Sequence, residues 1–345
     1  MKRRAFLGWM AGASAVAALP GCVSAARDEP WVMTVRGRLP VREMGVTLTH
    51  EHALANFQPY AEWQKAPIAY DRDEVVRRVL PYLHSIAAAG CRTFVDATAV
   101  GLGRDPLLLR RLSDESGLHV LTTTGNYAAF HGKFLPPYVL EESVETLAAR
   151  WIAEWRDGIG GTGVRPGFIK LGFNGGPLNE AERKLIRAGA IAHLATGLTI
   201  GAHTGQAVAA YEELAELERA GVHPSAWIWI HAQNEDDPSR YVDAAKRGAW
   251  ISLDGVSPDS IEKHVERVIG LRDAGLLGRA LVSQDAGWYS VGQPDGGKFR
   301  PYDTVFMDFI PALKARGFSG SEIERIFVRN PAAAFAVRVR TSRGV

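Results

Sequence analysis

Cysteine is scarce in this chain, and neither sign of charge is in large excess. Two cysteines among 345 residues exclude a disulfide-stapled scaffold and a cysteine-based zinc module. The formal net charge of +2 leaves no cationic surplus to neutralise a phosphate backbone, so we expect no nucleic-acid partner. A chain of this length can bury a large core without such covalent support.

Beyond the N-terminus, the sequence also lacks any stretch apolar enough to span a bilayer. Residues 1–26 have the pattern of an export signal, because the basic residues 2–4 precede an apolar segment over residues 9–19. The adjacent arginines, followed by a Phe-Leu pair at 6–7, favour the twin-arginine route. A Sec signal with a chance arginine pair is the alternative.

Two sites could end this signal. The segment 19–22, Leu-Pro-Gly-Cys, resembles a lipobox, which would place a lipid on Cys22 and anchor the protein to a membrane. The segment 23–26, Val-Ser-Ala-Ala, instead offers small residues for a soluble-type cleavage. In both cases we expect an exported, periplasmic protein in which residues 27–345 form one domain.

The rest of the chain alternates short apolar runs with amphipathic helical patterns. The apolar runs fall at 46–50, 93–96, 120–124, 168–171, 199–203, 227–231, 250–254 and 280–285. Between them lie helical patterns such as 72–89, 107–116, 141–156, 180–196, 207–220, 239–247 and 260–271. Eight such βα units predict an α/β fold, a closed (β/α)₈ TIM barrel. A small hairpin is expected over 31–40, before the first barrel strand.

Polar side chains gather at the C-terminal ends of these runs, which converge on one mouth of a barrel. They are His50 and His52, which share a face of one strand, and Lys170, His203, His231 and Asp285. Each has an ordinary alternative, a hydrogen-bonded core histidine or a lysine paired with a carboxylate. Their number, at five of the eight strand ends, is hard to explain by core packing.

In this order and spacing, the chain resembles the phosphotriesterase family of the amidohydrolase superfamily, in particular its lactonase-like members. The resemblance covers about residues 31–335. It is carried by Gly45–His52, Gly161–Lys170, His203-Thr204, His231, Val282–Asp285 and Asn330–Ala332.

The resemblance implies a dinuclear metal centre, most often zinc. It places His50, His52 and Asp285 on the more buried ion, and His203 and His231 on the more exposed one. Lys170 would be carboxylated by carbon dioxide and bridge both ions. Imidazole and carboxylate suit zinc, and a carbamate is anionic whereas an ammonium cannot bind a cation. We therefore expect hydrolysis by a metal-bridging hydroxide, with Asp285 accepting its proton.

The family acts on phosphotriesters, lactones and some N-acyl compounds, and the loops select among them. The segment 124–127 resembles the T-G-x-Tyr of lactonase-like members, in which the tyrosine, here Tyr127, reaches the metal centre. A packed aromatic residue is the alternative. Organophosphate-hydrolysing relatives carry an Asp–His proton relay where this chain has Asn234 and Gly255. Since neither can relay a proton, we expect only weak phosphotriesterase activity.

Four further residues are candidates for contact with the substrate. Lys298 and Arg300 could bind an anionic group, or they could be solvated charges on a loop. Trp288 could wall the pocket and His131 could add a polar contact, with simple packing as the alternative for both.

The leading hypothesis is therefore a dinuclear metal-dependent hydrolase of a small molecule, a lactone or a related ester. An amide or N-acyl hydrolase of the same fold is the first alternative. A ligand-binding lipoprotein that has lost catalysis is the second, although all six ligand positions are intact. Family members are often homodimers, but nothing in the sequence reveals an interface.

Overall fold

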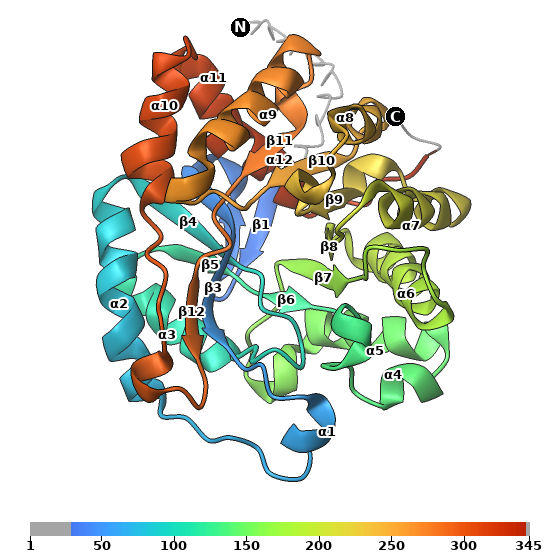
Figure 1. The fold of residues 1–345 in the computed structure, drawn as a ribbon. Coiled ribbons are helices and arrows are strands. Elements are labelled where there is room, and N and C mark those ends of the chain that lie inside the picture. The colour runs from blue at the N-terminus through green and yellow to red at the C-terminus, as the bar shows by residue number, and fades with distance from the viewer. Residues whose placement is uncertain (1–28, 343–345) are drawn as a thin grey trace, which may run out of the picture.

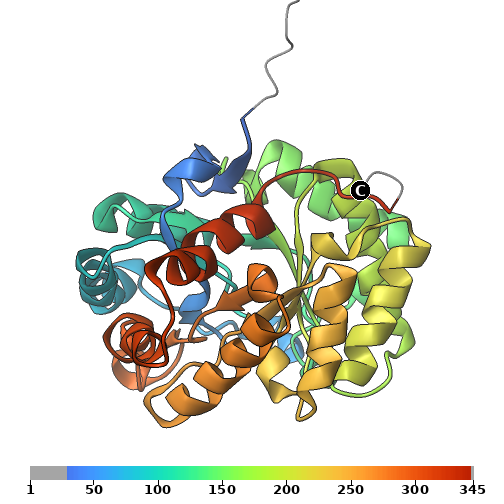
Figure 2. The same ribbon diagram turned by 90° about the horizontal axis from the view of Figure 1, so that it is seen from above.

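The computed structural model describes residues 29–342. The export signal predicted for residues 1–26, with Cys22, lies outside the described residues. Strands form the centre of the molecule and helices surround them, as the two views in Figures 1 and 2 show. The strands close into a parallel barrel, so the predicted (β/α)₈ fold is confirmed.

Eight strand positions make up the barrel, because β5 and β6 together occupy one of them. The strands are β3 (Val46–Ala55), β4 (Cys91–Asp96), β5 (His119–Leu121), β6 (Thr123–Thr124), β7 (Phe168–Gly172), β8 (Ile200–His203), β9 (Trp227–Ile230), β10 (Trp250–Leu253) and β11 (Ala280–Val282). The ring closes where the residues after β11 meet β3. The N–H of Asp285 donates to the carbonyl of His50 at 3.0 Å, and that of His52 to the carbonyl of Ala286 at 2.9 Å.

All the predicted strands are present, but several end elsewhere than expected. β3 continues to Ala55, so His50 and His52 lie within the strand rather than at its end. The third strand is interrupted at Thr122. β11 stops at Val282, and after the turn 283–286 a further strand, β12 (Gly287–Ser290), pairs with β3. The residue at which a strand ends depends on its hydrogen bonds to a neighbouring strand. The hydrophobic pattern of a single segment carries no information about that neighbour.

Helices lie on the outside of the barrel. They are α2 (Arg72–Ala88), α3 (Pro106–Ser116), α5 (Val144–Asp157), α6 (Glu180–Thr196), α7 (Ala207–Arg219), α8 (Pro238–Arg247) and α9 (Ile261–Asp273), with the shorter α1 (Tyr60–Trp63), α4 (Tyr138–Glu141), α10 (Ile310–Ala315), α11 (Gly320–Glu324) and α12 (Asn330–Phe335). The helix predicted over 141–156 is α5, which begins at Val144, and α4 ends at Glu141. α6 shows why the other predictions hold: a capping box of Asn179 and Glu182 begins it, and Gly197 at φ +76° ends it. None of the helices in the described chain is long and apolar enough to cross a membrane.

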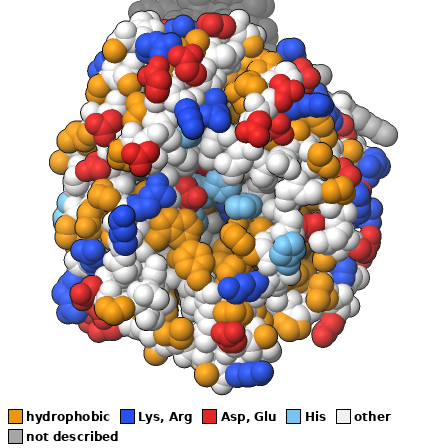
Figure 3. Space-filling view, viewed as in Figure 1, with side chains coloured by type: hydrophobic (Ala, Val, Ile, Leu, Met, Phe, Trp, Pro, Cys, Tyr) orange, Lys and Arg blue, Asp and Glu red, His pale blue; other side chains and the backbone are white. Residues whose placement is uncertain are grey.

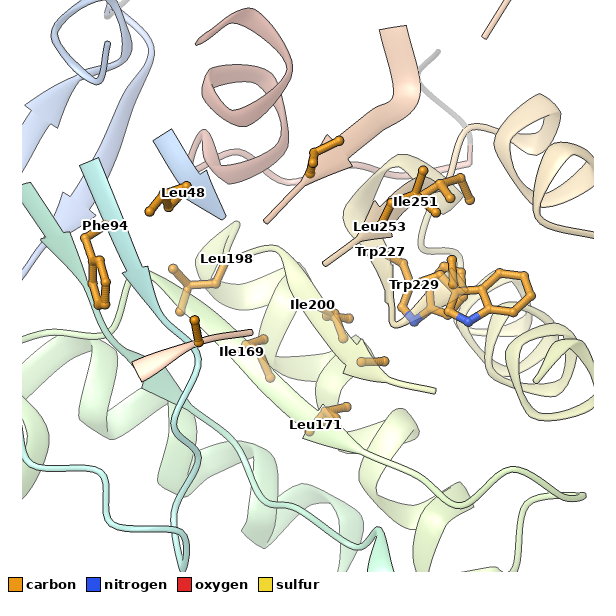
Figure 4. Packing of buried hydrophobic residues seen from close by; sticks show 14 of the residues in the cluster. Leu48, Phe94, Ile169, Leu171, Leu198, Ile200, Trp227, Trp229, Ile251 and Leu253 are labelled. Atoms are coloured by element: carbon orange, nitrogen blue, oxygen red, sulfur yellow. The ribbon is translucent and has the colours of Figure 1, made fainter. Parts of the chain in front are cut away.

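Side chains alternate between the two faces of each barrel strand. Ile169 and Leu171 of β7 belong to the apolar layer between strands and helices, together with Ile200 of β8 (Figure 4). Lys170, between them, therefore faces the barrel interior. Phe168, which also faces inward, packs in a second apolar cluster.

The predicted hairpin is confirmed as β1 (Trp31–Thr34) paired antiparallel with β2 (Gly37–Pro40). It contributes Val32 and Leu39 to the second cluster. In the same cluster, Phe335 of α12 contacts Phe168 edge-on, with ring centroids 5.4 Å apart. These apolar contacts fill the end of the barrel opposite the polar mouth.

Candidate metal centre

Three histidines at the barrel mouth are held by their Nδ1 atoms. Nδ1 of His50 donates to Oδ2 of Asp254 at 2.9 Å, and Nδ1 of His231 donates to Oδ1 of the same carboxylate at 2.7 Å. Nδ1 of His52 donates to Oγ1 of Thr98 at 2.8 Å, and that hydroxyl donates onward to a backbone carbonyl. Because each ring uses its Nδ1 proton in this way, the Nε2 lone pair remains available to a metal ion.

Two of these rings and Asp285 bring lone pairs together. Nε2 of His50 lies 3.3 Å from Nε2 of His52, and Oδ1 of Asp285 lies 3.1 Å from the latter and 3.6 Å from the former. Burial lowers the pKa of His50 to about 4, so its ring is neutral near pH 7. Oδ1 of Asp285 is buried and accepts no hydrogen bond from the described residues. Two ring nitrogens and a bare carboxylate oxygen this close fit a divalent cation between them.

Asp254 is a functional residue that the sequence analysis missed. It forms a second cluster with His50 and His231, but its oxygens are already occupied. Besides the two imidazoles, it accepts from Oγ of Ser252 at 2.7 Å and from Nε2 of Gln233 at 3.0 Å. Asp254 is therefore a residue that orients the ligands rather than a ligand itself. The sequence did contain a sign of this role, because Asp254 ends the seventh apolar run in the same way that Asp285 ends the eighth.

Backbone strain is concentrated around this mouth. His231 (φ 65°) and Asp285 (φ 51°) leave their strands through the left-handed region, and Trp288, Phe130 and His131 are also left-handed. These are five of the six non-glycine residues with positive φ in the described chain. Each such residue costs about 1–3 kcal/mol, which surrounding contacts must offset. Such outliers gather at functional sites, where a side chain must be aimed in one direction.

The more exposed side of the centre contains His203, at the end of β8. Its ring centroid lies 4.4 Å from that of His231 and 5.2 Å from that of Tyr127. Burial, and then the proximity of His231, hold the pKa of His203 well below its ordinary value. His203 is therefore a neutral ring. The two histidines predicted for the more exposed ion are thus adjacent.

Lys170 is buried inside the barrel, 2% exposed. No carboxylate of the described residues pairs with its Nζ. Burial lowers its pKa to about 8, although the negative charges of Asp254 and Asp285 oppose this shift. An unpaired buried ammonium is costly, and a partly neutral amine is the form that reacts with carbon dioxide. The environment of Lys170 thus fits its predicted carboxylation.

A row of aromatic rings runs along one side of the mouth. Trp288 stacks on His52 with centroids 3.9 Å apart, and Phe57 stacks on Trp288 at 5.4 Å. Phe134 lies 6.3 Å from Phe57, and Phe130 lies 6.0 Å from Phe134. Phe57 and Phe130 are 47% and 58% exposed. Hydrophobic side chains accordingly lie beside the histidines in the hollowed centre of the face shown in Figure 3.

The other predicted substrate contacts are placed less centrally. Lys298 and His131 are exposed, and the N–H of His131 donates to Asn174. Arg300 is half-buried, and its guanidinium donates to the carbonyl of Asp285 at 2.9 Å and that of Gln284 at 3.2 Å. Two of its donors are therefore engaged by the backbone. Anion binding by Lys298 and Arg300 stays a prediction.

A parallel α/β barrel with histidine and aspartate lone pairs converging at the C-terminal mouth defines a metal-dependent hydrolase. The family model described as the phosphotriesterase family matches residues 30–335. The chain therefore belongs to the phosphotriesterase family, as its resemblance implied.

Several known proteins are similar to this chain over nearly their whole length. A phosphotriesterase homology protein of Escherichia coli is 29% identical over 84% of this chain and 98% of its own. An aryldialkylphosphatase of Saccharolobus solfataricus is 29% identical over 86% and 96%, and a human N-acetyltaurine hydrolase is 25% identical over 87% and 96%. Among solved structures, a mutant organophosphorus hydrolase from Deinococcus radiodurans has a TM-score of 0.80 and 26% identity, over 88% of this chain and 97% of its own.

Proposed function

We propose that this hydrolase uses two divalent metal ions, zinc by family precedent, to hydrolyse a lactone or a related ester. The observation that carries the proposal is the convergence of the Nε2 atoms of His50 and His52 and the bare Oδ1 of Asp285 at the barrel mouth. His50, His52 and Asp285 would hold the more buried ion, and His203 and His231 the more exposed one. When bound, two such ions lower the pKa of water toward 7 and polarise a carbonyl oxygen.

Three residues of the chain have distinct tasks in this proposal. Burial opposes ionisation of Asp285, but the adjacent His50 and His52 hold its pKa well below the ordinary value, so it is a carboxylate that can accept the proton of the attacking water. Lys170, as a carbamate, would supply the anionic bridge. Burial raises the pKa of Tyr127 well above the ordinary value, so its phenol is neutral and can donate a hydrogen bond to the substrate.

The walls of the mouth favour a neutral substrate with an apolar or aromatic group. Phe57 and Phe130 expose large apolar surfaces beside Trp288. The nearby cation Arg300 donates two of its bonds to the backbone. Gly255 has no side chain, so the proton relay of organophosphate-hydrolysing relatives is absent at that position. These features support ester hydrolysis over efficient phosphotriester hydrolysis.

An N-acyl amide is the second candidate substrate. Its support is the similarity to the N-acetyltaurine hydrolases, which cover most of this chain. The substrate named for those relatives carries an anionic group. An anionic amide would require Lys298, or Arg300 after it gives up its backbone bonds.

The experiment is a proton-release assay on the zinc-loaded protein, residues 27–345. The substrates are neutral aliphatic lactones, anionic sugar lactones and a phosphotriester. Hydrolysis of N-acyl amino acids releases no net proton near neutral pH, because the freed amine takes up the proton, so it is followed by a colorimetric assay of that amine. We expect lactone turnover that Asp285→Asn abolishes. The absence of turnover on every lactone by a protein that binds two metal ions would overturn the proposal, and turnover of the N-acyl compounds would establish the alternative.

We also propose that the protein acts in the periplasm, either anchored through a lipid on Cys22 or released after cleavage at 23–26. Fractionation of cells that produce the full chain, with Cys22→Ala as the control, separates these two forms. Assembly as a homodimer is likewise proposed from the family and is measured by sedimentation.

A further inference from the structure

The turn 283–286, which carries Asp285, is held on its N–H side by one buried carboxylate. Oε1 of Glu51 accepts from Oγ of Ser283 at 2.7 Å and from the N–H of Gln284 at 3.0 Å. Oε2 of Glu51 accepts from the N–H of Ala286 at 2.7 Å. Glu51 thus binds the backbone immediately before and immediately after Asp285.

The same turn is held on its carbonyl side by one guanidinium. Arg300 donates to the carbonyls of Gln284 and Asp285, and Nε1 of Trp288 donates to the carbonyl of Asp285 at 2.8 Å. Arg300 is itself fixed by two backbone hydrogen bonds with Gly287, each 2.9 Å long. The carboxyl group of Glu51 therefore binds the N–H groups of the turn, and the guanidinium of Arg300 binds its carbonyls.

This arrangement explains why Asp285 stays in the left-handed conformation. At φ 51° its side chain is directed to His50 and His52. If β11 continued through this position, successive side chains would instead point to alternate faces of the strand. Glu51 lies between those two histidines in the sequence. On the strand its side chain faces away from theirs, so it contacts the turn from behind and leaves the metal side free.

We propose that Glu51 and Arg300 are positioning residues, which together hold the turn 283–286 so that the carboxylate of Asp285 reaches the metal. The inference rests on the metal centre of the proposed function but not on the identity of the substrate. It gives Arg300 a task in addition to, or in place of, the predicted contact with an anionic substrate. Neither residue touches the reacting atoms.

The test compares Glu51→Gln with Glu182→Gln. Glu182 is a matched control, because it is also buried and accepts two backbone N–H bonds, from Asn174 at 2.8 Å and Asn179 at 2.9 Å. In Glu51→Gln one oxygen becomes an amide that faces a donor. The metal-free proteins are titrated with Co²⁺, and affinity, visible absorption and thermal unfolding are recorded.

We expect both variants to lose thermal stability, but only Glu51→Gln to bind the more tightly held Co²⁺ about 10- to 100-fold more weakly and to change its absorption spectrum. The proposal would be overturned if Glu51→Gln had the same Co²⁺ affinity and absorption spectrum as the parent protein. It would also be overturned if Glu182→Gln lost as much Co²⁺ affinity as Glu51→Gln. A parent protein that binds Co²⁺ but hydrolyses no ester would refute the proposed function and leave this test intact.

Arg300→Met provides a second test that does not depend on a buried carboxylate. Its control is Arg36→Met, since the guanidinium of Arg36 also donates to backbone carbonyls, those of Ser113, Gly117 and Leu118. Arg36 lies between β1 and β2, away from the mouth. We expect weaker Co²⁺ binding and a lower kcat in Arg300→Met, with KM for a neutral lactone changed less than twofold, and partial rescue in Arg300→Lys. A change confined to KM would mean that Arg300 contacts substrate instead, and would overturn its positioning role.

Discussion

Oδ1 of Asp254 lies 2.7 Å from Nδ1 of His231, and the other oxygen of the same carboxylate holds His50. In the proposed centre these two histidines would hold different metal ions, so one buried carboxylate would orient a ligand of each. Burial opposes the ionisation of Asp254, but the His231 and His50 rings that donate hydrogen bonds to it hold its pKa well below the ordinary value. It is therefore an acceptor for both rings.

Replacing Asp254 with Asn should weaken both metal sites. One oxygen becomes an amide N–H donor, so one of the two rings must change tautomer or lose its partner. We expect zinc affinity to fall about 10- to 100-fold, measured by calorimetric titration of the metal-free protein. Ser252→Ala is the control, because it removes another donor to Asp254 and leaves both histidine contacts. Equal affinities in Asp254→Asn and the parent would contradict this role.

Asp285→Asn should abolish turnover even where metal is retained. The amide cannot accept the proton of the attacking water, and general-base catalysis of this kind contributes about 10²- to 10⁴-fold. We expect kcat for a lactone to fall within that range or further, measured at saturating zinc. Asp295→Asn, on the same loop but exposed, should retain parent activity. A ligand-binding protein without catalysis would show no turnover in any of the three proteins.

Lys170→Met should remove the dependence of metal binding on carbon dioxide. In the parent, reconstitution with zinc in bicarbonate should recover more activity than reconstitution in buffer free of carbon dioxide, because a carbamate carries the negative charge that an amine lacks. The variant should stay inactive in both buffers. Lys246→Met, exposed on α8, should behave as the parent does. Equal recovery of the parent with and without bicarbonate would argue against the carbamate.

Phe130→Ala should weaken binding of substrates with large apolar groups. The loss of one partly exposed ring from the row beside the metals predicts a KM about 10-fold higher for an aryl-substituted lactone and little change for a small one. Steady-state kinetics with the two lactones measure this difference. Leu140→Ala, which removes an equally exposed apolar residue on α4, is the control. A similar rise in KM for both lactones would assign Phe130 to structure alone.

Acid should destabilise the protein partly through Glu216, which bridges α6 and α7. Hydrogen bonds from Arg187, together with Arg219, outweigh burial and lower the pKa of Glu216 from 4.5 to about 2. A lowered folded-state pKa stabilises above about pH 4.5, and this stabilisation is lost as the pH falls toward 2. Glu216→Gln should therefore flatten the fall in Tm between those pH values. Glu141→Gln, an exposed glutamate on α4, should leave the slope unchanged.

The barrel could be predicted from the order of strands and helices, because the hydrophobic periodicity of each βα unit is visible within its own segment of sequence. The run that contains Ile169, Lys170 and Leu171 places a lysine on the interior face whatever the partner strands are. The ligands His50 and His52 could likewise be predicted from alternation along one strand. The convergence of strand ends then follows from the fold class, so residues far apart in the chain could be assigned to one mouth.

The sequence by itself therefore determined the barrel, the six ligand candidates and the family. Only the tertiary structure decided which side chains serve those ligands. In the sequence, Asp254 cannot be told from any other acidic residue at a strand end; the structure shows that two imidazoles donate to its oxygens. Arg300 was predicted to contact the substrate, and the structure shows that its guanidinium donates to the carbonyl of Asp285. Such roles depend on distances between segments that no local periodicity encodes. At the strained turn 283–286, for example, the buried N–H and carbonyl groups of the backbone need hydrogen-bond partners, and side chains from other segments of the chain provide them.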